Sequence, residues 1–313
     1  MGIRLIKLKI ALIYIAVNLF VPLIVDLSYS LECFNSKFLF DIKPNVDQPS
    51  DAAIGPNGDI YLVDGVNHRV VVFDSNGKQK FTFGRQGADK GEFKYPLGID
   101  IAEDGKVFIA DTGNHRIQAF DLSGNFLNMF VVKTGTDEKP ADPADVLVSK
   151  LKNRLYVSDN DNHKVKVFSQ KGKFDFEWGK FGEGPGEFRY PGILTANEFN
   201  QVFVVDVLNT RVQVFDPFGE YISDIGSWGV LPGKLFRPKG VAIDKKNRVF
   251  VSDSYMGLIQ AFTALGRFIG VICENNQKKH FTTPVGMVMD DNRKRLYVVE
   301  MRANKISILK ILD

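Results

Sequence analysis

The chain has 313 residues, of which 44% are hydrophobic and 25% are charged, and its formal net charge is +3. These fractions are typical of a folded globular protein. Residues 1–30 carry three basic residues and one acidic residue, so only +1 of the net charge belongs to the rest. A concentrated basic face, which nucleic-acid binding requires, is therefore not expected.

The first 30 residues have the layout of an export signal. Three basic residues precede the apolar segment 10–25, and Ser28 and Ser30 follow it. This order is typical of a secretory signal peptide. The apolar run is long for a signal core and short for a membrane span, so an uncleaved helical anchor through residues 10–25 is the alternative. Both interpretations predict that residues 31–313 are exported to a periplasmic or extracellular space, because the basic flank stays cytoplasmic.

Residues 31–313 consist of one motif repeated six times. In each copy a short β-favouring run ends in an acidic residue and a turn, and the acidic residues recur every 47 or 48 positions: Asp64, Asp111, Asp159, Asp206, Asp253 and Glu300. A proline precedes each run in phase: Pro49, Pro96, Pro143, Pro191, Pro238 and Pro284. One strand–turn–strand unit per fixed period predicts a single domain built of repeats.

Each repeat contains four predicted strands. In the second repeat they are Gly98–Ala102, Lys106–Asp111, Arg116–Asp121 and Asn125–Val131. The sixth repeat ends before it can form a fourth strand, whereas residues 36–42 resemble the fourth strand of the other repeats. We therefore expect residues 36–42 to pair with residues 304–309 and to close the ring, because closure removes an exposed sheet edge.

Three segments of the second repeat resemble the NHL repeat: Gly91–Phe93, Pro96–Ile99 and Asp111–Ile117. The resemblance extends over about residues 36–313 and implies an all-β, six-bladed β-propeller. It implies far less about function, because NHL propellers bind proteins or RNA and related propellers include lyases and hydrolases. Export and a near-neutral charge favour a protein or a cell-envelope component as the partner over RNA.

The acidic residues of the repeat are expected to pair with a basic residue five positions later, across the turn. The pairs are Asp64 with Arg69, Asp111 with Arg116, Asp159 with Lys164, Asp206 with Arg211, and Glu300 with Lys305. The turns also carry His68, His115 and His163. A six-fold ring holds these histidines too far apart to share one zinc ion.

Three carboxylates are predicted near the central channel. Asp51 and Asp145 follow the opening proline by two residues, and Asp100 lies two positions further along its own repeat. Carboxylates suit Ca²⁺, so one interpretation is a cation site at the channel mouth, which a lyase or hydrolase would use. The other is that they face a wet channel or bond backbone groups. No other cofactor is expected, and no catalytic motif is recognisable in the sequence.

The fifth repeat departs from the pattern and suggests a binding surface. Met256 and Leu258 stand where asparagine and a basic residue belong, and the preceding loop is apolar. The predicted patch comprises Trp228, Leu231, Phe236, Tyr255, Met256 and Leu258. Such a patch is typical of a protein interface, and the alternative is a small satellite core. The favoured function is a non-catalytic scaffold for a protein or ligand, with a metal-dependent lyase or hydrolase as the alternative.

The two cysteines, Cys33 and Cys273, precede and follow the outer strands of neighbouring blades. Equivalent strands run in the same direction, so the sulfurs are expected near opposite faces. A disulfide requires Cα atoms within about 7 Å. The sequence therefore predicts no bridge between them.

Overall fold

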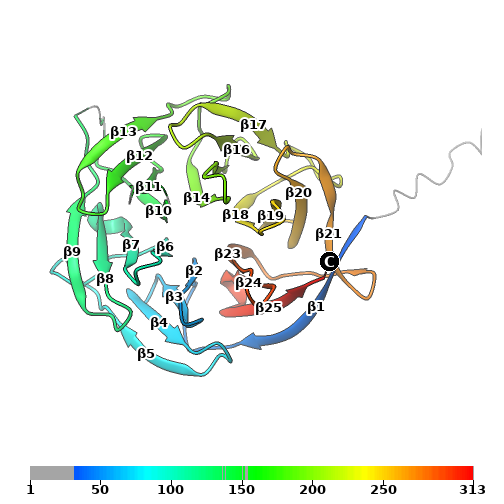
Figure 1. The fold of residues 1–313 in the computed structure, drawn as a ribbon, viewed down its shortest axis with the longest axis horizontal. Coiled ribbons are helices and arrows are strands. Elements are labelled where there is room, and N and C mark those ends of the chain that lie inside the picture. Colours follow the sequence, from blue (N-terminus) through cyan, green and yellow to red (C-terminus); the bar gives the residue numbers. More distant parts are fainter. Residues whose placement is uncertain (1–31, 136, 138, 150, 152–153, 313) are drawn as a thin grey trace, which may run out of the picture. The chain divides into compact units, whose positions relative to one another are not determined.

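The computed structural model describes residues 32–135, 137, 139–149, 151 and 154–312. The predicted signal or anchor at residues 1–30 lies outside the described residues. The part from Cys33 onward is one compact unit. It is a six-bladed β-propeller, whose innermost strands are arranged around a common centre (Figure 1). Residues of these strands line a central channel. The sequence-based prediction of an all-β propeller is confirmed.

Each blade is an antiparallel sheet whose strands follow one another from the channel outward. Blade 1 contains β2 (Ala52–Ile54), β3 (Ile60–Asp64), β4 (Arg69–Phe73) and β5 (Gln79–Phe83). Blade 2 contains β6 (Ile99–Ile101), β7 (Val107–Asp111), β8 (Arg116–Phe120) and β9 (Phe126–Val131). Blade 3 contains β10 (Pro143–Val148), β11 (Arg154–Asp159), β12 (Lys164–Ser169) and β13 (Phe174–Trp178).

Blade 4 contains β14 (Pro191–Ala196), β15 (Val202–Asp206), β16 (Arg211–Phe215) and β17 (Tyr221–Ile225). Blade 5 contains β18 (Pro238–Ile243), β19 (Arg248–Asp253), β20 (Leu258–Thr263), β21 (Phe268–Glu274) and the short β22 (Gln277–Lys278). Blade 6 contains β23 (Pro284–Asp290), β24 (Arg295–Glu300), β25 (Lys305–Ile311) and the N-terminal β1 (Cys33–Ile42). Single 3₁₀ turns, η2 (Thr112–Asn114) and η3 (Met301–Ala303), follow β7 and β24.

Burial explains the two sequence patterns of the strands. The middle strands lie between neighbouring blades and are buried on both faces, as in β3, so they read as continuous apolar runs. The outer β9 alternates between half-buried and exposed residues, as a sheet with one wet face does. The repeat phenylalanines pack between blades, and the rings of Phe83 and Phe120 lie 5.1 Å apart.

The N-terminal strand closes the ring as predicted. β1 pairs antiparallel with β25, from Ser36 opposite Ile311 to Ile42 opposite Ile306. β1 begins three residues before the predicted strand, and this extension has a second partner. Residues Cys33 to Asn35 pair parallel with Val271 to Cys273 of β21. One strand therefore joins blade 5 to blade 6.

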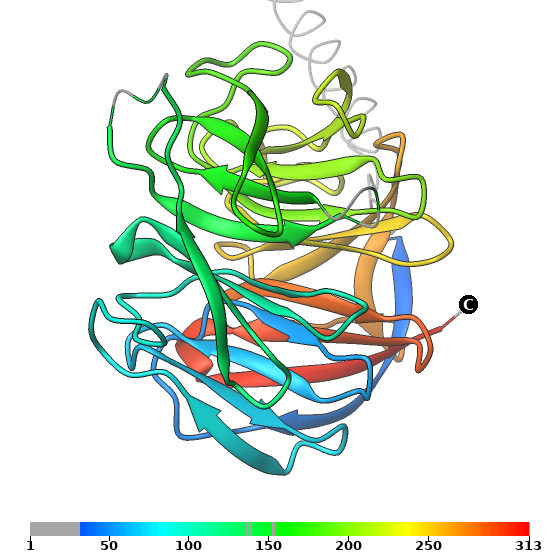
Figure 2. The same cartoon turned by 60° about the vertical axis from the view of Figure 1, so that its left-hand side comes forward.

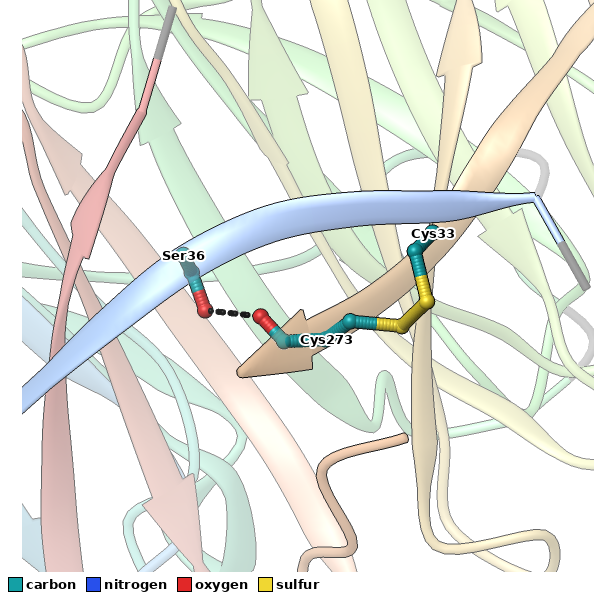
Figure 3. Close-up of a disulfide and its surroundings, with 3 residues drawn as sticks. All are labelled: Cys33, Ser36 and Cys273. Carbon is teal, nitrogen blue, oxygen red and sulfur yellow. Dashed lines mark hydrogen bonds between the residues drawn. A yellow bond between two sulfur atoms is a disulfide. The ribbon is translucent and has the colours of Figure 1, made fainter. Parts of the chain in front are cut away.

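The prediction of no disulfide is wrong: Cys33 and Cys273 are bonded, with Cα atoms 5.4 Å apart. Figure 2 shows β1, in blue, beside β21, in orange. The prediction assigned each outer strand to its own blade. Because the parallel pair is staggered, the start of β1 meets the end of β21 and not its start. The Ser36 hydroxyl, which donates a hydrogen bond to the Cys273 carbonyl at 3.0 Å, holds the same junction (Figure 3).

Candidate functional site

The loops between blades and the turns between the second and third strands share one face, as predicted, which we call the loop face. The repeated acid bonds the two segments together. Asp111 accepts a hydrogen bond from the Lys94 backbone N–H at 2.7 Å, and Asp206 accepts one from Arg189 N–H at 2.8 Å. The same bond is found in every blade, so the acid connects each turn to the loop that precedes its blade. The acids are thus scaffold residues.

The ion pairs across the turn form in four repeats and change in the third. The Asp–Arg pairs Asp64–Arg69, Asp111–Arg116 and Asp206–Arg211 measure 2.8, 2.7 and 3.0 Å, and Glu300–Lys305 measures 3.1 Å. In blade 3 the Asp159 carboxylate instead contacts Lys166, at 2.5 Å. Lys164, the expected partner, lies 2.6 Å from Glu177. Lys166 occupies the position of Gln118 in blade 2 and Gln213 in blade 4. Both glutamines donate a hydrogen bond to the repeated acid of their blade, so a side chain at this position can reach Asp159.

The turn histidines link neighbouring blades. Nδ1 of His68 accepts a hydrogen bond from the backbone N–H of Tyr95 at 3.0 Å, and the two rings lie 4.5 Å apart. Between blades 3 and 4, Nδ1 of His163 accepts the equivalent hydrogen bond from the backbone N–H of Tyr190 at 3.3 Å. The corresponding nitrogen of His115 lies 2.5 Å from the Ala141 carbonyl, with which it shares a hydrogen bond. Each histidine is thus engaged with the backbone of the next blade.

The three axial carboxylates also link neighbouring blades, which the sequence offered only as one of two interpretations. Asp51 of blade 1 accepts a bond from Ile99 N–H of blade 2 at 3.2 Å. In the same way, Asp100 of blade 2 accepts a hydrogen bond from Val148 N–H of blade 3, and Asp145 of blade 3 accepts one from Leu194 N–H of blade 4, both at 2.7 Å. The carboxylates therefore bond the inner strands of blades 1 to 4 in series.

These carboxylates line the far part of the channel, a cavity of about 500 Å³. Burial raises the pKa of Asp51 to about 8 and that of Asp100 to about 6. Burial and the charge of Asp51 together raise the pKa of Asp145 well above its usual value. Within the described part of the chain, no three His, Cys, Asp or Glu side chains are grouped to hold a metal ion.

The loop that precedes blade 5, residues 226–237, lacks side-chain bonds that hold the equivalent loops before blades 2 and 4. Asn114 and Asn209 donate hydrogen bonds to Gly87 and Gly182 in the equivalent loops, both at 2.9 Å. Met256 takes this asparagine's place in blade 5.

The arginine bonds to this loop are missing as well. Arg116 and Arg211 donate to two or more backbone carbonyls of their loops. Leu258 stands at the equivalent position and has no donor to offer. The Gln260 amide still donates to the Lys234 carbonyl, so the base of the loop keeps its contact with blade 5.

The predicted patch is split between surface and core. Trp228, Tyr255 and Leu231 are exposed, with 72%, 65% and 55% of their surface accessible. Phe236 and Met256 are half-buried, and the Phe236 ring packs against the ring of Tyr255, with the two ring centroids 4.4 Å apart. Leu258 is only 6% exposed and belongs to the core beneath. Two residues of the loop were not predicted to belong to the patch. Val230 is 61% exposed, and Leu235 is buried in the core between blades 4 and 5.

Comparison with known proteins supports the repeat assignment. Residues 47–73 and 93–120 match the NHL repeat, and residues 142–201 and 192–273 match a family described as a 6-bladed beta-propeller. No curated protein matches the chain. Among the described residues, the structure contains no helix of the length and apolarity that crossing a membrane requires.

Solved structures share the fold at low identity. A gluconolactonase from Xanthomonas campestris matches with a TM-score of 0.67 and 12% identity, over 90% of this chain and 96% of that one. A catalytically inactive virginiamycin B lyase from Staphylococcus aureus, with quinupristin, gives 0.63 and 14%, over 86% and 82%. Hydrazine synthase from Kuenenia stuttgartiensis gives 0.60 and 10%, over 86% and 97%. Identities this low establish a common fold and nothing about activity.

Proposed function

Because the chain belongs to the NHL-repeat six-bladed β-propellers, we propose that it is a non-catalytic scaffold whose loop face binds a protein. The observation that carries the proposal is the exposure of Trp228, Val230, Leu231 and Tyr255 on adjoining segments of blade 5. The residues that contribute most to binding at protein interfaces are often tryptophan and tyrosine. Single exposed apolar residues are common on protein surfaces, whereas a cluster of them is typical of an interaction site.

The construction of blade 5 supports the same proposal. Leu235 and Leu258 are buried, whereas Trp228 is 72% exposed. Trp228 therefore contributes little to the packing of its own blade. A tryptophan side chain has only two torsion angles, so it offers a large contact area and loses little conformational entropy on binding.

The partner is identified by a photo-crosslinking amino acid placed at position 228 in the native host. We expect one protein to be crosslinked from position 228 and again from position 255. The matched control is position 199, because Phe199 is as exposed as Trp228 but lies in the turn between β14 and β15, on the opposite face. Crosslinks to the same set of proteins from positions 228 and 199 would contradict the proposal.

The metal-dependent lyase or hydrolase is the alternative, and it rests on Asp51, Asp100 and Asp145. Their bonds to backbone N–H groups of the next blade satisfy one oxygen of each without a cation. Equilibrium dialysis of the purified protein with Ca²⁺ separates the two functions. Stoichiometric binding that Asp51→Asn and Asp100→Asn abolish would favour the enzyme, whereas no binding is expected for the scaffold.

We also propose export, either by cleavage of residues 1–30 or with these residues as a membrane tether. The disulfide between Cys33 and Cys273 supports an oxidising compartment, because such bonds persist there and are rare in a reducing cytosol. N-terminal sequencing of the mature protein distinguishes the two forms. A chain that begins near residue 31 indicates cleavage, and one that begins at Met1 in the membrane fraction indicates a tether.

A further inference from the structure

The central channel opens on the loop face into a cavity of about 760 Å³, which we call the mouth cavity. Pockets that bind small organic molecules have volumes in this range. All six blades contribute to its wall the residue that follows the opening proline. These residues are Ser50, Leu97, Ala144, Gly192, Lys239 and Val285. Only Lys239 of blade 5 brings a charge to this ring.

Two further cations line the mouth cavity beside Lys239. Arg237 occupies the position that Tyr95 and Tyr190 have in blades 2 and 4, and Arg302 occupies in blade 6 the turn position of Tyr255. The described lining of the cavity includes no carboxylate. Across the residues that the structure describes, none of the three cations forms an ion pair.

The three cations give the mouth cavity a positive charge that no carboxylate of its described lining offsets. Burial, and then the charge of Arg237, lower the pKa of Lys239. A half-buried ammonium group next to a second cation is destabilised by lost hydration and by repulsion. An anion that enters the cavity relieves both effects, and charge-assisted hydrogen bonds to lysine and arginine hold it.

The buried acids near the channel lie outside the described lining of the mouth cavity. Asp253 accepts hydrogen bonds from the backbone N–H groups of Phe236 and Arg237. Asp51 and Asp145 line the far part of the channel and direct one carboxylate oxygen to a backbone N–H of the next blade. Their raised pKa values reflect burial, and no nearby cation offsets it. The positive charge of the mouth cavity is therefore available to a ligand.

The rest of the wall combines polar residues, among them Asn160, His280 and Thr283, with apolar and aromatic ones. Tyr255 and Met256 lie on one side, and Leu97 and Val285 belong to the ring of six. We propose that the mouth cavity binds a small organic anion, whose carboxylate or other oxyanion group contacts Lys239, Arg237 and Arg302 and whose apolar body packs against Tyr255 and Met256. This inference concerns the channel and does not depend on the protein partner proposed for Trp228.

Isothermal titration calorimetry with 1-naphthoate tests the proposal, with the neutral 1-naphthamide as the matched ligand. We expect saturable one-to-one binding of the acid, and binding of the amide weaker by about tenfold or more. Lys239→Gln and Arg302→Gln should each weaken naphthoate binding by about fivefold or more. Added salt should weaken it too, because the attraction is electrostatic.

Two variants serve as controls. Lys90→Gln removes an exposed lysine of the loop face, and Trp228→Ala removes the tryptophan of the patch. Neither residue lines the cavity, so both variants should keep the wild-type affinity for naphthoate. Arg302 is exposed, so its variant is expected to fold, and thermal unfolding verifies this. Absence of saturable naphthoate binding, equal affinity for acid and amide, or unchanged affinity in both cavity variants would overturn the proposal. None of these results would affect the protein-binding function of the patch.

Discussion

Asp51, Asp100 and Asp145, the aspartates of the channel wall, link neighbouring blades and make the stability of the fold depend on pH. Each carboxyl group bonds the next blade, yet Asp51 and Asp145 are buried in the channel wall and Asp100 is half-buried there. Asp51 has a pKa of about 8, whereas its ordinary value is 3.8. The folded chain therefore keeps a proton that the unfolded chain releases above about pH 4.

Stability should consequently fall as pH rises through this window. The contribution of protonated Asp51 is fully present below about pH 4 and is lost as pH approaches 8. Asp51→Asn keeps the hydrogen-bond acceptor and removes the titration. We expect its free energy of unfolding to depend less on pH than that of the wild type, by more than about 1 kcal/mol between these limits.

Urea titrations at several pH values measure the effect. Asp100→Asn is the control for the size of the effect. Because the pKa of Asp100 is only about 6, this substitution should change the pH dependence of stability over a narrower pH range than Asp51→Asn. Parallel pH profiles for the wild type and Asp51→Asn would show that Asp51 is ionised in the folded protein.

At the scale of elements, β1 is the segment that sequence analysis described least completely. Its pairing with β25 follows from the missing fourth strand of the sixth repeat. Its first three residues pair with β21 instead, and no repeat pattern covers them. The stagger of that parallel pair, which brings Cys33 to Cys273, depends on how blades 5 and 6 meet and is not encoded in either strand alone.

The disulfide should stabilise this junction substantially, since it links residues 240 positions apart. Reduction, or Cys273→Ser, is expected to lower the free energy of unfolding by roughly 2–5 kcal/mol. Denaturant titrations with and without dithiothreitol test this. The variant that carries both Cys33→Ser and Cys273→Ser is the control, because dithiothreitol should not affect it. An equal effect of dithiothreitol on the wild type and this control would contradict the prediction.

For the whole molecule, closure of the ring should decide whether the propeller remains a monomer. Deletion of residues 31–43 removes β1 and exposes β25 as an edge strand, which invites pairing with another chain. We expect the deleted protein to unfold or to oligomerise, as measured by thermal unfolding and light scattering. A chain that begins at Glu32 keeps the strand and is the control. A monomer with an unchanged melting temperature after the larger deletion would rule out closure by β1.

Sequence reasoning predicted the ring well because every blade repeats the same local signals. The acids, the prolines and the apolar middle strands are fixed by their own repeat. Other features depend on neighbours. Lys166 replaces Lys164 as the partner of Asp159. Leu258 was predicted to lie on the surface, but it is buried, as Arg116 and Arg211 are at the equivalent position of blades 2 and 4.

The mouth cavity illustrates the same limit. Lys239 becomes informative only when the six residues after the prolines are placed around one channel. Its neighbour Arg302 comes from a different blade, so no linear motif contains both. The charge of the channel mouth is a property of the assembled ring.

The affinity of the loop face for its crosslinked protein partner tests the central proposal most directly. We expect Trp228→Ala to weaken binding by roughly 2 kcal/mol or more, while the free energy of unfolding stays within about 0.5 kcal/mol of the wild type. Phe199→Ala, an equally exposed aromatic residue on the opposite face, should leave the affinity unchanged. A Trp228→Ala protein that is destabilised by several kcal/mol yet binds its partner with wild-type affinity would contradict the account.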